Sequence, residues 1–481
     1  MSEQKKGGKY LAKRKKKKVA GGYAAPFFAV LFVLTVVSFI IPLRPTRSEN
    51  EKRALAEFPA FSWEALTSGS YFDDINLWFS DTYPGRDSWI SLSAATKDLH
   101  GIQDVKIYGD VSSQETVPEE YVPIFIETRP PAPEVTEPPV TEGTLPEGTL
   151  PPETEPPMTE PEETVAPPTN PVEEWGGVDA GSAEVYLGNV IQIGDTAFNY
   201  LRFSQYESER FINTMNWLQE DMAGKEDVDI VTVAIPGGVG VMVEPEYQQK
   251  LDCADQQQII DYLYSGISDE IVKVDIFDKL VSHNNEYLYF RTDHHWTAQG
   301  AYYCYEEICK SLGMEPTPLE DFEELDMGTF RGTNYYKCNQ SSQLKLDNVY
   351  AYRPYGDITM MISNENGRFS QPMITDMSRS KENAKYMTFL AGDHPLCEIT
   401  NNDLPDGPTC VIIKDSYGNP VAPFFSTNYH KVYVVDFREY KRMNIQEFVD
   451  AYEVDDVIFL VQLLTIQNAT YNNLIRGICG V

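Results

Sequence analysis

Basic residues are scarce in this 481-residue chain beyond its first eighteen positions. Residues 1–18 hold nine lysines and arginines against one acid, a charge of +8, although the whole chain carries −34. The rest of the chain therefore carries −42, and so acidic a surface repels nucleic-acid phosphates. This charge argues against nucleic acid as a partner.

Paired cysteine motifs are also absent. None of the seven cysteines belongs to a C-x-x-C sequence, which disfavours a zinc ribbon or a thioredoxin-like redox site. Because seven is odd, at least one thiol is either free or paired with another chain. Disulfides and buried cysteines acting as small apolar residues are both compatible with the sequence.

Charged residues are missing altogether from positions 19–43. The central part, Ala24–Ile41, is nearly all apolar, and the segment reaches the length of about 20 residues that a helix needs to cross a bilayer. Nine basic residues precede it and two, Arg44 and Arg47, follow, which predicts a cytoplasmic N-terminus. We predict a single-pass cell-membrane protein with a basic cytoplasmic tail over 1–18, a transmembrane signal anchor over 19–43 and the remainder extracytoplasmic. A cleaved signal peptide is the alternative, but no A-x-A site follows the apolar run.

A second segment has little capacity to form a core. Residues 111–180 are dominated by proline, threonine, glutamate and valine. Such a composition buries too little apolar surface to offset the entropy of ordering the chain. We predict a disordered Pro/Thr/Glu-rich linker or insertion, either an extended stalk or a loop whose ends lie close together. Before it, residues 48–108 have helical periodicity and should form a helical N-terminal part of the extracytoplasmic domain.

The remainder, residues 184–481, alternates between strand and helix patterns. Short Val/Ile-rich runs are typical of buried strands, and helical stretches separate several of them. This alternating pattern predicts an α/β domain with a mostly parallel sheet covered on both faces by helices. Shorter strands and turns predict a β-rich insertion around 325–399. The strands are expected at 228–235, 271–277, 286–290, 409–413, 431–435 and 457–461.

Reactive side chains follow one of these strands, 286–290. Active sites of such sheets form at the carboxyl ends of strands. Asp293, His294 and His295 come directly after this strand, and Thr297 is the expected N-cap of a helix. In an extended chain, an Asp two residues before a His lies on the same side. Asp293 can therefore hydrogen-bond the His295 imidazole and stabilise its protonated form.

The strand 409–413 is followed by Ser416, and a helix beginning at Pro420 is expected after it. The Ser416 hydroxyl would then lie at a strand-to-helix turn, where its own backbone N–H can stabilise an oxyanion. A serine nucleophile needs an adjacent base, and His295 is the candidate, with Asp293 as the orienting carboxylate. The same residues are compatible with a purely structural role. The adjacent histidines with Asp293 are also compatible with a metal site, although no cysteine or glutamate at ligand spacing accompanies them and no metal is expected.

These motifs together resemble a known family. Asp293-His294-His295-Trp296, preceded by Tyr289-Phe290-Arg291-Thr292, is similar to the signature of bacterial DHHW proteins. These proteins group with the alginate O-acetyltransferase-like branch of the SGNH hydrolase superfamily. The match extends over about residues 48–108 and 184–481. Further agreeing stretches are Glu51-Lys52-Arg53, Tyr83-Pro84, Phe389–Pro395, Lys414–Asn419 and Val435-Asp436 with Arg438.

The resemblance implies an SGNH-hydrolase-like three-layer α/β/α sandwich over 184–481 and a triad of Ser416, His295 and Asp293. Together with the predicted anchor, it implies a membrane-anchored extracytoplasmic serine O-acetyltransferase or acetylesterase. Such an enzyme acts on cell-envelope or secreted polysaccharide through an acyl-serine intermediate and needs no cofactor. Lower-ranking substrate-binding candidates near the site are Arg291, Asn419 and Arg438.

Three points are left open by the resemblance. Transfer and hydrolysis share one acyl-enzyme, so sequence does not separate them. A membrane acyl exporter as the source of acetyl groups is implied by the family alone. The alternative function is a non-catalytic cell-envelope glycan-binding or assembly protein that keeps the fold.

One departure from the family is the loop Pro236-Gly237-Gly238, where Pro is usually followed by Asn or Lys.

Overall fold

The computed structural model describes residues 44, 46–48, 53–63, 71–72, 75, 78–79, 82–83, 115–119, 121–124, 129, 183–186, 190–225, 227–251 and 253–481. The chain divides into two units, Met1–Gln103 and Asp104–Val481. The predicted tail and anchor, 1–18 and 19–43, lie outside the described residues. Among the helices of the described part, none combines the length and the apolarity that crossing a membrane requires.

In the first unit, a short antiparallel pair joins β1 (Arg47–Ser48) to β2 (Arg53–Ala54). Arg44 lies with its guanidinium 4.1 Å from the ring centre of Trp78, and its Nη1 donates to Thr82 Oγ1 at 2.8 Å. The first residue after the predicted anchor is therefore held by side-chain contacts within this unit.

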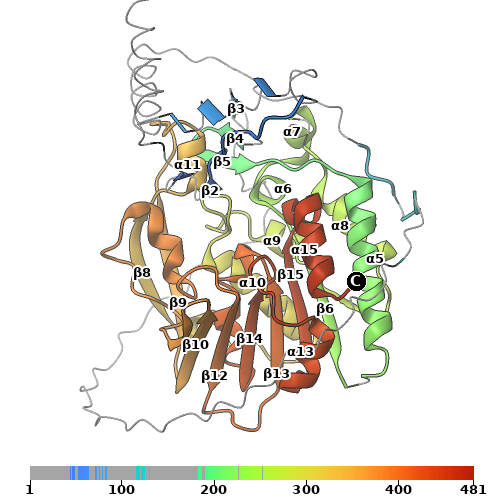
Figure 1. The fold of residues 1–481 in the computed structure, drawn as a ribbon. Helices are drawn as coiled ribbons and strands as arrows, with labels where there is room; N and C mark the ends of the chain where they lie inside the picture. Colours follow the sequence, from blue (N-terminus) through green and yellow to red (C-terminus); the bar gives the residue numbers. More distant parts are fainter. Residues whose placement is uncertain are drawn as a thin grey trace, which may run out of the picture. The chain divides into compact units, whose positions relative to one another are not determined.

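The second unit is built on an eight-stranded mixed sheet (Figure 1). Five neighbouring strands are parallel, in the order β14 (Lys431–Asp436), β13 (Thr409–Lys414), β15 (Asp456–Gln462), β6 (Asp229–Ile235) and β7 (Val272–Lys273). Beyond β14 the sheet continues antiparallel with β12 (Leu396–Asn401), β10 (Ile358–Asn364) and β11 (Gly367–Ser370).

Side chains of the parallel strands alternate between two apolar layers. One layer contains Val411 and Val457, and the other contains Ile412 and Ile458. Helices cover both layers, which explains the unbroken Val/Ile runs. The first layer packs against α5 (Gln205–Met222), α8 (Gln256–Gly266), α13 (Ile445–Tyr452), α14 (Leu463–Ile466) and α15 (Ala469–Ile478). The second packs against α9 (Phe277–Ser282), α10 (Ala298–Ser311) and α12 (Ala422–Phe425).

Four of the predicted strands are confirmed within one residue at each end, namely β6, β13, β14 and β15. The strand predicted over 271–277 is reduced to the two residues of β7, and Phe277 already begins α9. The strand predicted over 286–290 is wrong. There the chain folds back on itself, with Tyr289 bridging Trp296 and Thr297 N donating to Leu288 O at 2.8 Å.

Thr297 is the N-cap of α10, as predicted, and its side chain accepts from Gly300 N. The helix predicted from Pro420 is wrong. The chain instead forms the 3₁₀ turn η3 (Ser416–Gly418) and then the four-residue helix α12. All seven cysteines are buried, as expected of residues acting as small apolar side chains.

The β-rich region predicted around 325–399 is divided between two sheets. β8 (Phe322–Phe330) and β9 (Asp347–Pro354) form a separate antiparallel pair, whereas β10 to β12 extend the main sheet. Two short helices, α11 (Thr333–Lys337) and the 3₁₀ helix η2 (Glu382–Thr388), lie in the same region. A small sheet of β3 (Ala183–Tyr186), β4 (Val190–Ile193) and β5 (Thr196–Asn199) precedes α5, and α6 (Gly238–Met242) and α7 (Pro245–Lys250) follow β6.

Most of the predicted linker lies outside the described residues, but its first part lies against α5 and α8. Tyr121 N donates to Ser265 Oγ at 3.0 Å. Ile124 N donates to both carboxylate oxygens of the fully buried Glu209, at 2.8 and 3.0 Å. Both flanks of residues 130–182 belong to the second unit, and whether these residues form an insertion or a stalk stays a prediction.

Candidate active site

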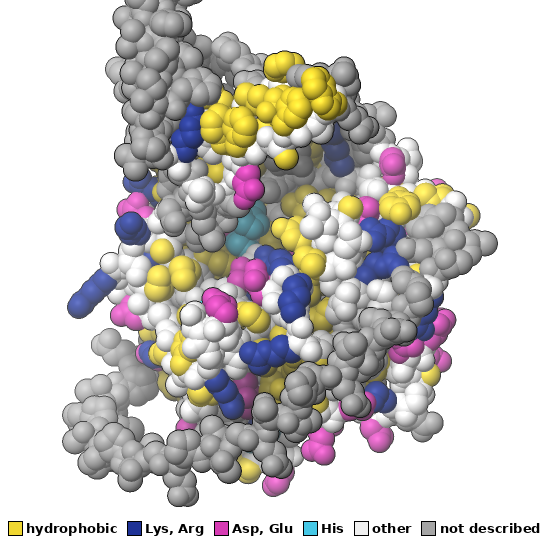
Figure 2. Space-filling model, in the orientation of Figure 1, with side chains coloured by type: hydrophobic (Ala, Val, Ile, Leu, Met, Phe, Trp, Pro, Cys, Tyr) yellow, Lys and Arg dark blue, Asp and Glu magenta, His cyan; other side chains and the backbone are white. Residues whose placement is uncertain are grey.

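Ser416, His295 and Asp293 meet at the carboxyl edge of the parallel strands. Ser416 directly follows β13 and Asp415, and its Oγ lies 2.7 Å from His295 Nε2. His295 Nδ1 lies 2.5 Å from Asp293 Oδ1. A continuous hydrogen-bonded line therefore runs from a serine hydroxyl through an imidazole to a carboxylate. On the face shown in Figure 2, a histidine side chain lies in a hollow of the surface.

Asp293 is buried, and both of its carboxylate oxygens accept hydrogen bonds. Thr333 donates to its Oδ2 from both the backbone N–H (2.7 Å) and the hydroxyl (3.1 Å). Burial raises the pKa of the Asp293 carboxyl, but attraction to His294 and His295 and the hydrogen bonds from His295 and Thr333 outweigh burial and hold the pKa well below its usual range. Asp293 thus stays ionised and fixes His295 with Nδ1 protonated, which leaves Nε2 to accept the serine proton. Gly332 makes room for this arrangement, since a Cβ there would lie 2.2 Å from Asp293 Cβ.

The loop that presents Asp293 and His295 is a series of bends, not the extended chain that the sequence predicts. Buried Asp347 holds it by accepting from the backbone N–H groups of Arg291 (2.8 Å) and Thr292 (2.7 Å). Burial raises the pKa of Asp347 in spite of these bonds. The Asp-His contact is therefore made by a compact turn with its own carboxylate support.

The loop and the Ser416 turn are joined by aromatic side chains. Trp296 Nε1 donates to Tyr417 O at 2.9 Å, and the Tyr417 hydroxyl donates to His294 O. Tyr386, from η2, stacks on the His295 ring and donates to Ser416 O. Thr333, Asp347 and Tyr386 were missed by sequence reasoning, and no pattern around them marks a site.

The predicted substrate-binding residues are engaged with carboxylates. Arg438 binds Asp436 through Nε (2.8 Å) and one terminal nitrogen (2.6 Å), and also lies 3.0 Å from Asp393. Asn419 Nδ2 donates to Asp393 Oδ1 at 2.8 Å. Arg291 lies with its guanidinium 4.7 Å from the ring centre of Tyr287 and 3.8 Å from Asp347. A substrate contact by any of the three stays a prediction.

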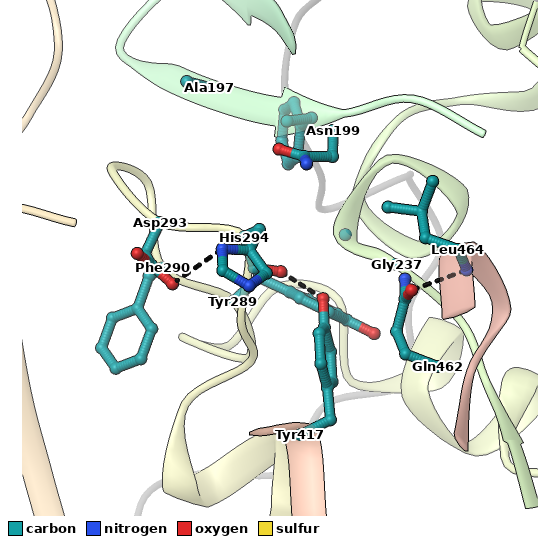
Figure 3. A pocket seen from close by; sticks show the side chains of 12 residues that line it. Ala197, Asn199, Gly237, Tyr289, Phe290, Asp293, His294, Tyr417, Gln462 and Leu464 are labelled. Carbon is teal, nitrogen blue, oxygen red and sulfur yellow. Dashed lines mark hydrogen bonds and ion pairs between the residues drawn. The ribbon is translucent and has the colours of Figure 1, made fainter. Parts of the chain in front are cut away.

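A pocket opens beside the triad, on the side of His294 and Tyr417 (Figure 3). Its wall is completed by three strand ends: Asn199 ends β5, Gly237 follows β6, and Gln462 ends β15. Aromatic rings and amide side chains are both present, which suits a ligand with an apolar face and polar oxygens.

Asp293, His294 and His295 each place one possible metal-ligand atom within 4.8 Å of the others. However, both ring nitrogens of His295 are already occupied, Nδ1 by Asp293 and Nε2 by Ser416. The geometry therefore favours acid-base chemistry on the Ser416 hydroxyl over metal ligation by His295.

A family model described as DHHW protein matches residues 51–124 and 165–435 of the chain. No curated protein matches it. Among solved structures, the crystal structure of a DHHW family protein from Eubacterium siraeum DSM 15702 has 23% sequence identity and a TM-score of 0.53. That match covers 59% of this chain and 93% of the other, and it supports the mixed α/β fold described above.

Two further solved structures are more distant. Bacillus cereus PatB1 has 14% identity and a TM-score of 0.49, with 59% of this chain and 98% of the other covered. The O-acetyltransferase domain of Pseudomonas putida AlgJ has 9% identity and a TM-score of 0.32, with 61% and 98% covered.

Proposed function

We propose that this chain, which belongs to the DHHW protein family, is a serine O-acetyltransferase or acetylesterase that works through a covalent intermediate on Ser416. One observation carries the proposal: Ser416 Oγ, His295 and Asp293 are in hydrogen-bonded line, with contacts of 2.7 and 2.5 Å. A serine hydroxyl is a weak nucleophile unless a base of this kind takes its proton. A protein that only bound glycan would not need this alignment.

In the proposed reaction, Ser416 Oγ attacks the acetyl carbonyl while His295 Nε2 takes the hydroxyl proton. Asp293 stabilises the imidazolium that forms. The tetrahedral intermediate collapses, the alcohol leaves with the proton from His295, and acetyl-Ser416 remains. His295 then deprotonates the second nucleophile, which takes the acetyl group and restores the Ser416 hydroxyl. A sugar hydroxyl makes the reaction a transfer, and water makes it a hydrolysis.

The choice of acetyl as the transferred group rests on the family resemblance, not on the shape of the pocket. The same holds for the choice of a cell-envelope or secreted polysaccharide as the substrate. The basic tail and apolar segment of the sequence support a place on the outer face of the cell membrane, with the N-terminus in the cytoplasm. A membrane acyl exporter is the proposed source of acetyl groups. An SGNH-like three-layer sandwich is the fold proposed for the second unit, because helices cover both faces of its sheet.

Turnover of a chromogenic acetyl ester by the full chain in detergent tests the proposal. We expect Ser416→Ala and His295→Ala each to lose at least about a thousandfold in kcat. His430→Gln is the matched control, since His430 bonds Asn401 O at the other end of β14. A chelator should leave activity unchanged. Full activity in Ser416→Ala would refute the triad, and loss on chelation would favour a metal site. Absence of wild-type turnover with several acyl donors would favour the glycan-binding alternative.

A further inference from the structure

Gln462 has a side chain with only one of its two polar atoms bonded. It is buried, with 4% of its surface exposed, and it lines the pocket beside the triad. Its Oε1 accepts from Leu464 N at 2.6 Å. Because the oxygen must face that donor, the amide can take only one orientation, and Nε2 points into the pocket (Figure 3). Among the described residues, nothing accepts a hydrogen bond from Nε2.

Gln462 ends β15 beside the end of β13, and Ser416 follows β13 in the turn η3. Lys414 of β13 pairs with Leu460 of β15, and Ser416 and Gln462 each lie two residues further along. Adjacent strands are only about 4.8 Å apart. Asp415, which directly precedes Ser416, links the two chain segments beyond the last pair, since its Oδ2 accepts from Gln462 N at 3.0 Å.

The strand on the other side makes room for the amide. Gln462 pairs with Ile235 of β6, and Gly237 follows two residues later. A Cβ on Gly237 would lie only 3.1 Å from Gln462 Nε2. Gly237 itself is held in place by a bond from its N–H to Gln256 Oε1 at 2.7 Å. The absent side chain at 237 therefore leaves the amide nitrogen facing open space.

We infer that Gln462 Nε2 donates a hydrogen bond to the carbonyl oxygen of the acyl group when Ser416 attacks it. This inference rests on the proposed function. As the Ser416 Oγ–carbon bond forms, the carbonyl electron pair moves to its oxygen, which becomes negative. Gln462 N–H, together with the backbone N–H of Ser416, stabilises that charge without giving up its proton. The charge returns to the C=O bond when the alcohol leaves. Gln462 thus acts as a catalytic residue whose side chain forms part of the oxyanion hole.

Gln462→Glu tests this role most sharply, because it keeps an oxygen for Leu464 N and puts a carboxylate oxygen in place of the donor, where its charge repels an oxyanion. We expect kcat for the chromogenic acetyl ester to fall about 10²- to 10³-fold in the full chain, with KM within about threefold. Gln467→Glu is the matched control. Its side chain accepts from Ser204 N and donates to Ser208 Oγ outside the pocket, and its kcat should match wild type.

Gly237→Ala provides a second variant in case Gln462→Glu fails to fold. The added methyl group would lie 3.1 Å from the amide nitrogen and shift it by a few tenths of an ångström, so kcat should fall about two- to tenfold with KM unchanged. Wild-type kcat in either folded variant, or a rise in KM alone, would overturn the inference. Failure of the proposed function would look different, because wild type itself would then show no turnover dependent on Ser416.

Discussion

The ring of Tyr386 lies flat against the imidazole of His295, with ring centroids 4.0 Å apart and planes 15° from parallel. The hydroxyl of the same side chain donates to the Ser416 carbonyl oxygen at 2.8 Å. Burial and the nearby Asp293 charge raise the pKa of the Tyr386 phenol well above its ordinary value, so it stays a donor. One side chain therefore positions both the base and the nucleophile without reacting itself.

Tyr386→Phe keeps the stacked ring and removes only the hydroxyl. Losing one such bond costs about 0.5–1.5 kcal/mol, so we expect kcat to fall about two- to tenfold. Tyr386→Leu removes the ring as well and should lower kcat further, with KM nearly unchanged. Steady-state kinetics on both variants, with melting temperatures as a folding control, check this. Equal kcat in the two variants would show that the stacked ring does not position His295.

Asp293→Asn should be far more damaging than a change in its partner Thr333. The neutral amide no longer fixes His295 with Nδ1 protonated, and kcat should fall by about 10⁴-fold. Thr333→Val removes one donor to Asp293 Oδ2 but keeps the backbone N–H at 2.7 Å, so the loss should stay within about tenfold. Similar losses in the two variants would mean that Asp293 acts only as a structural anchor.

Lys414 is a buried cation with 1% of its side chain exposed, lying 2.8 Å from Asp436 and 3.1 Å from Asp393. Lys414→Met leaves the buried Asp436 carboxylate with one cation fewer, so urea unfolding should show a loss of about 3–5 kcal/mol. Lys431→Met is the control. Lys431 pairs with Glu398 near the surface, and its loss should stay within about 1 kcal/mol. A small loss in Lys414→Met would mean that Arg438 alone neutralises Asp436.

Stability should also depend on Asp456. Burial, reinforced by Asp229 and Asp455, raises the pKa of this carboxyl to about 6. Between the unfolded pKa of about 3.9 and the native pKa of about 6, Asp456 binds more protons in the native state than in the unfolded state. Its contribution to the free energy of unfolding is therefore complete at low pH and is lost as pH rises through 6. Asp456→Asn can still accept from Tyr429 (2.8 Å) and carries no charge. We expect it to stabilise the protein by about 1–3 kcal/mol at pH 8 and by little at pH 4. An equal gain at both pH values would contradict the assignment.

The parallel strands were predictable because burial on both faces demands unbroken apolar runs, which few other structures require. Asp293, His295 and Ser416 were expected to lie together because each lies in a short motif after an apolar run, and the structure places them in hydrogen-bond contact. The reason given for the Asp-His contact was wrong, since a turn supported by Asp347 replaces the expected extended chain.

The supporting residues were not predictable, because folding alone brings them to the site. Thr333 lies 40 residues from Asp293, and Tyr386 lies 30 residues from Ser416. Both come from the β-rich region, where short strands and turns carry no catalytic motif. Predicting Gln462 as a site residue would have required the order of strands in the sheet, which places β15 between β13 and β6.

The most direct test of the account is to isolate the covalent intermediate. The full chain is mixed with the chromogenic acetyl ester, quenched in acid, digested and analysed by mass spectrometry. The account predicts an acetyl group on the peptide that contains Ser416, absent in Ser416→Ala and much reduced in His295→Ala. Continued turnover with no acetyl group on Ser416, or acetylation of another residue in step with turnover, would contradict it.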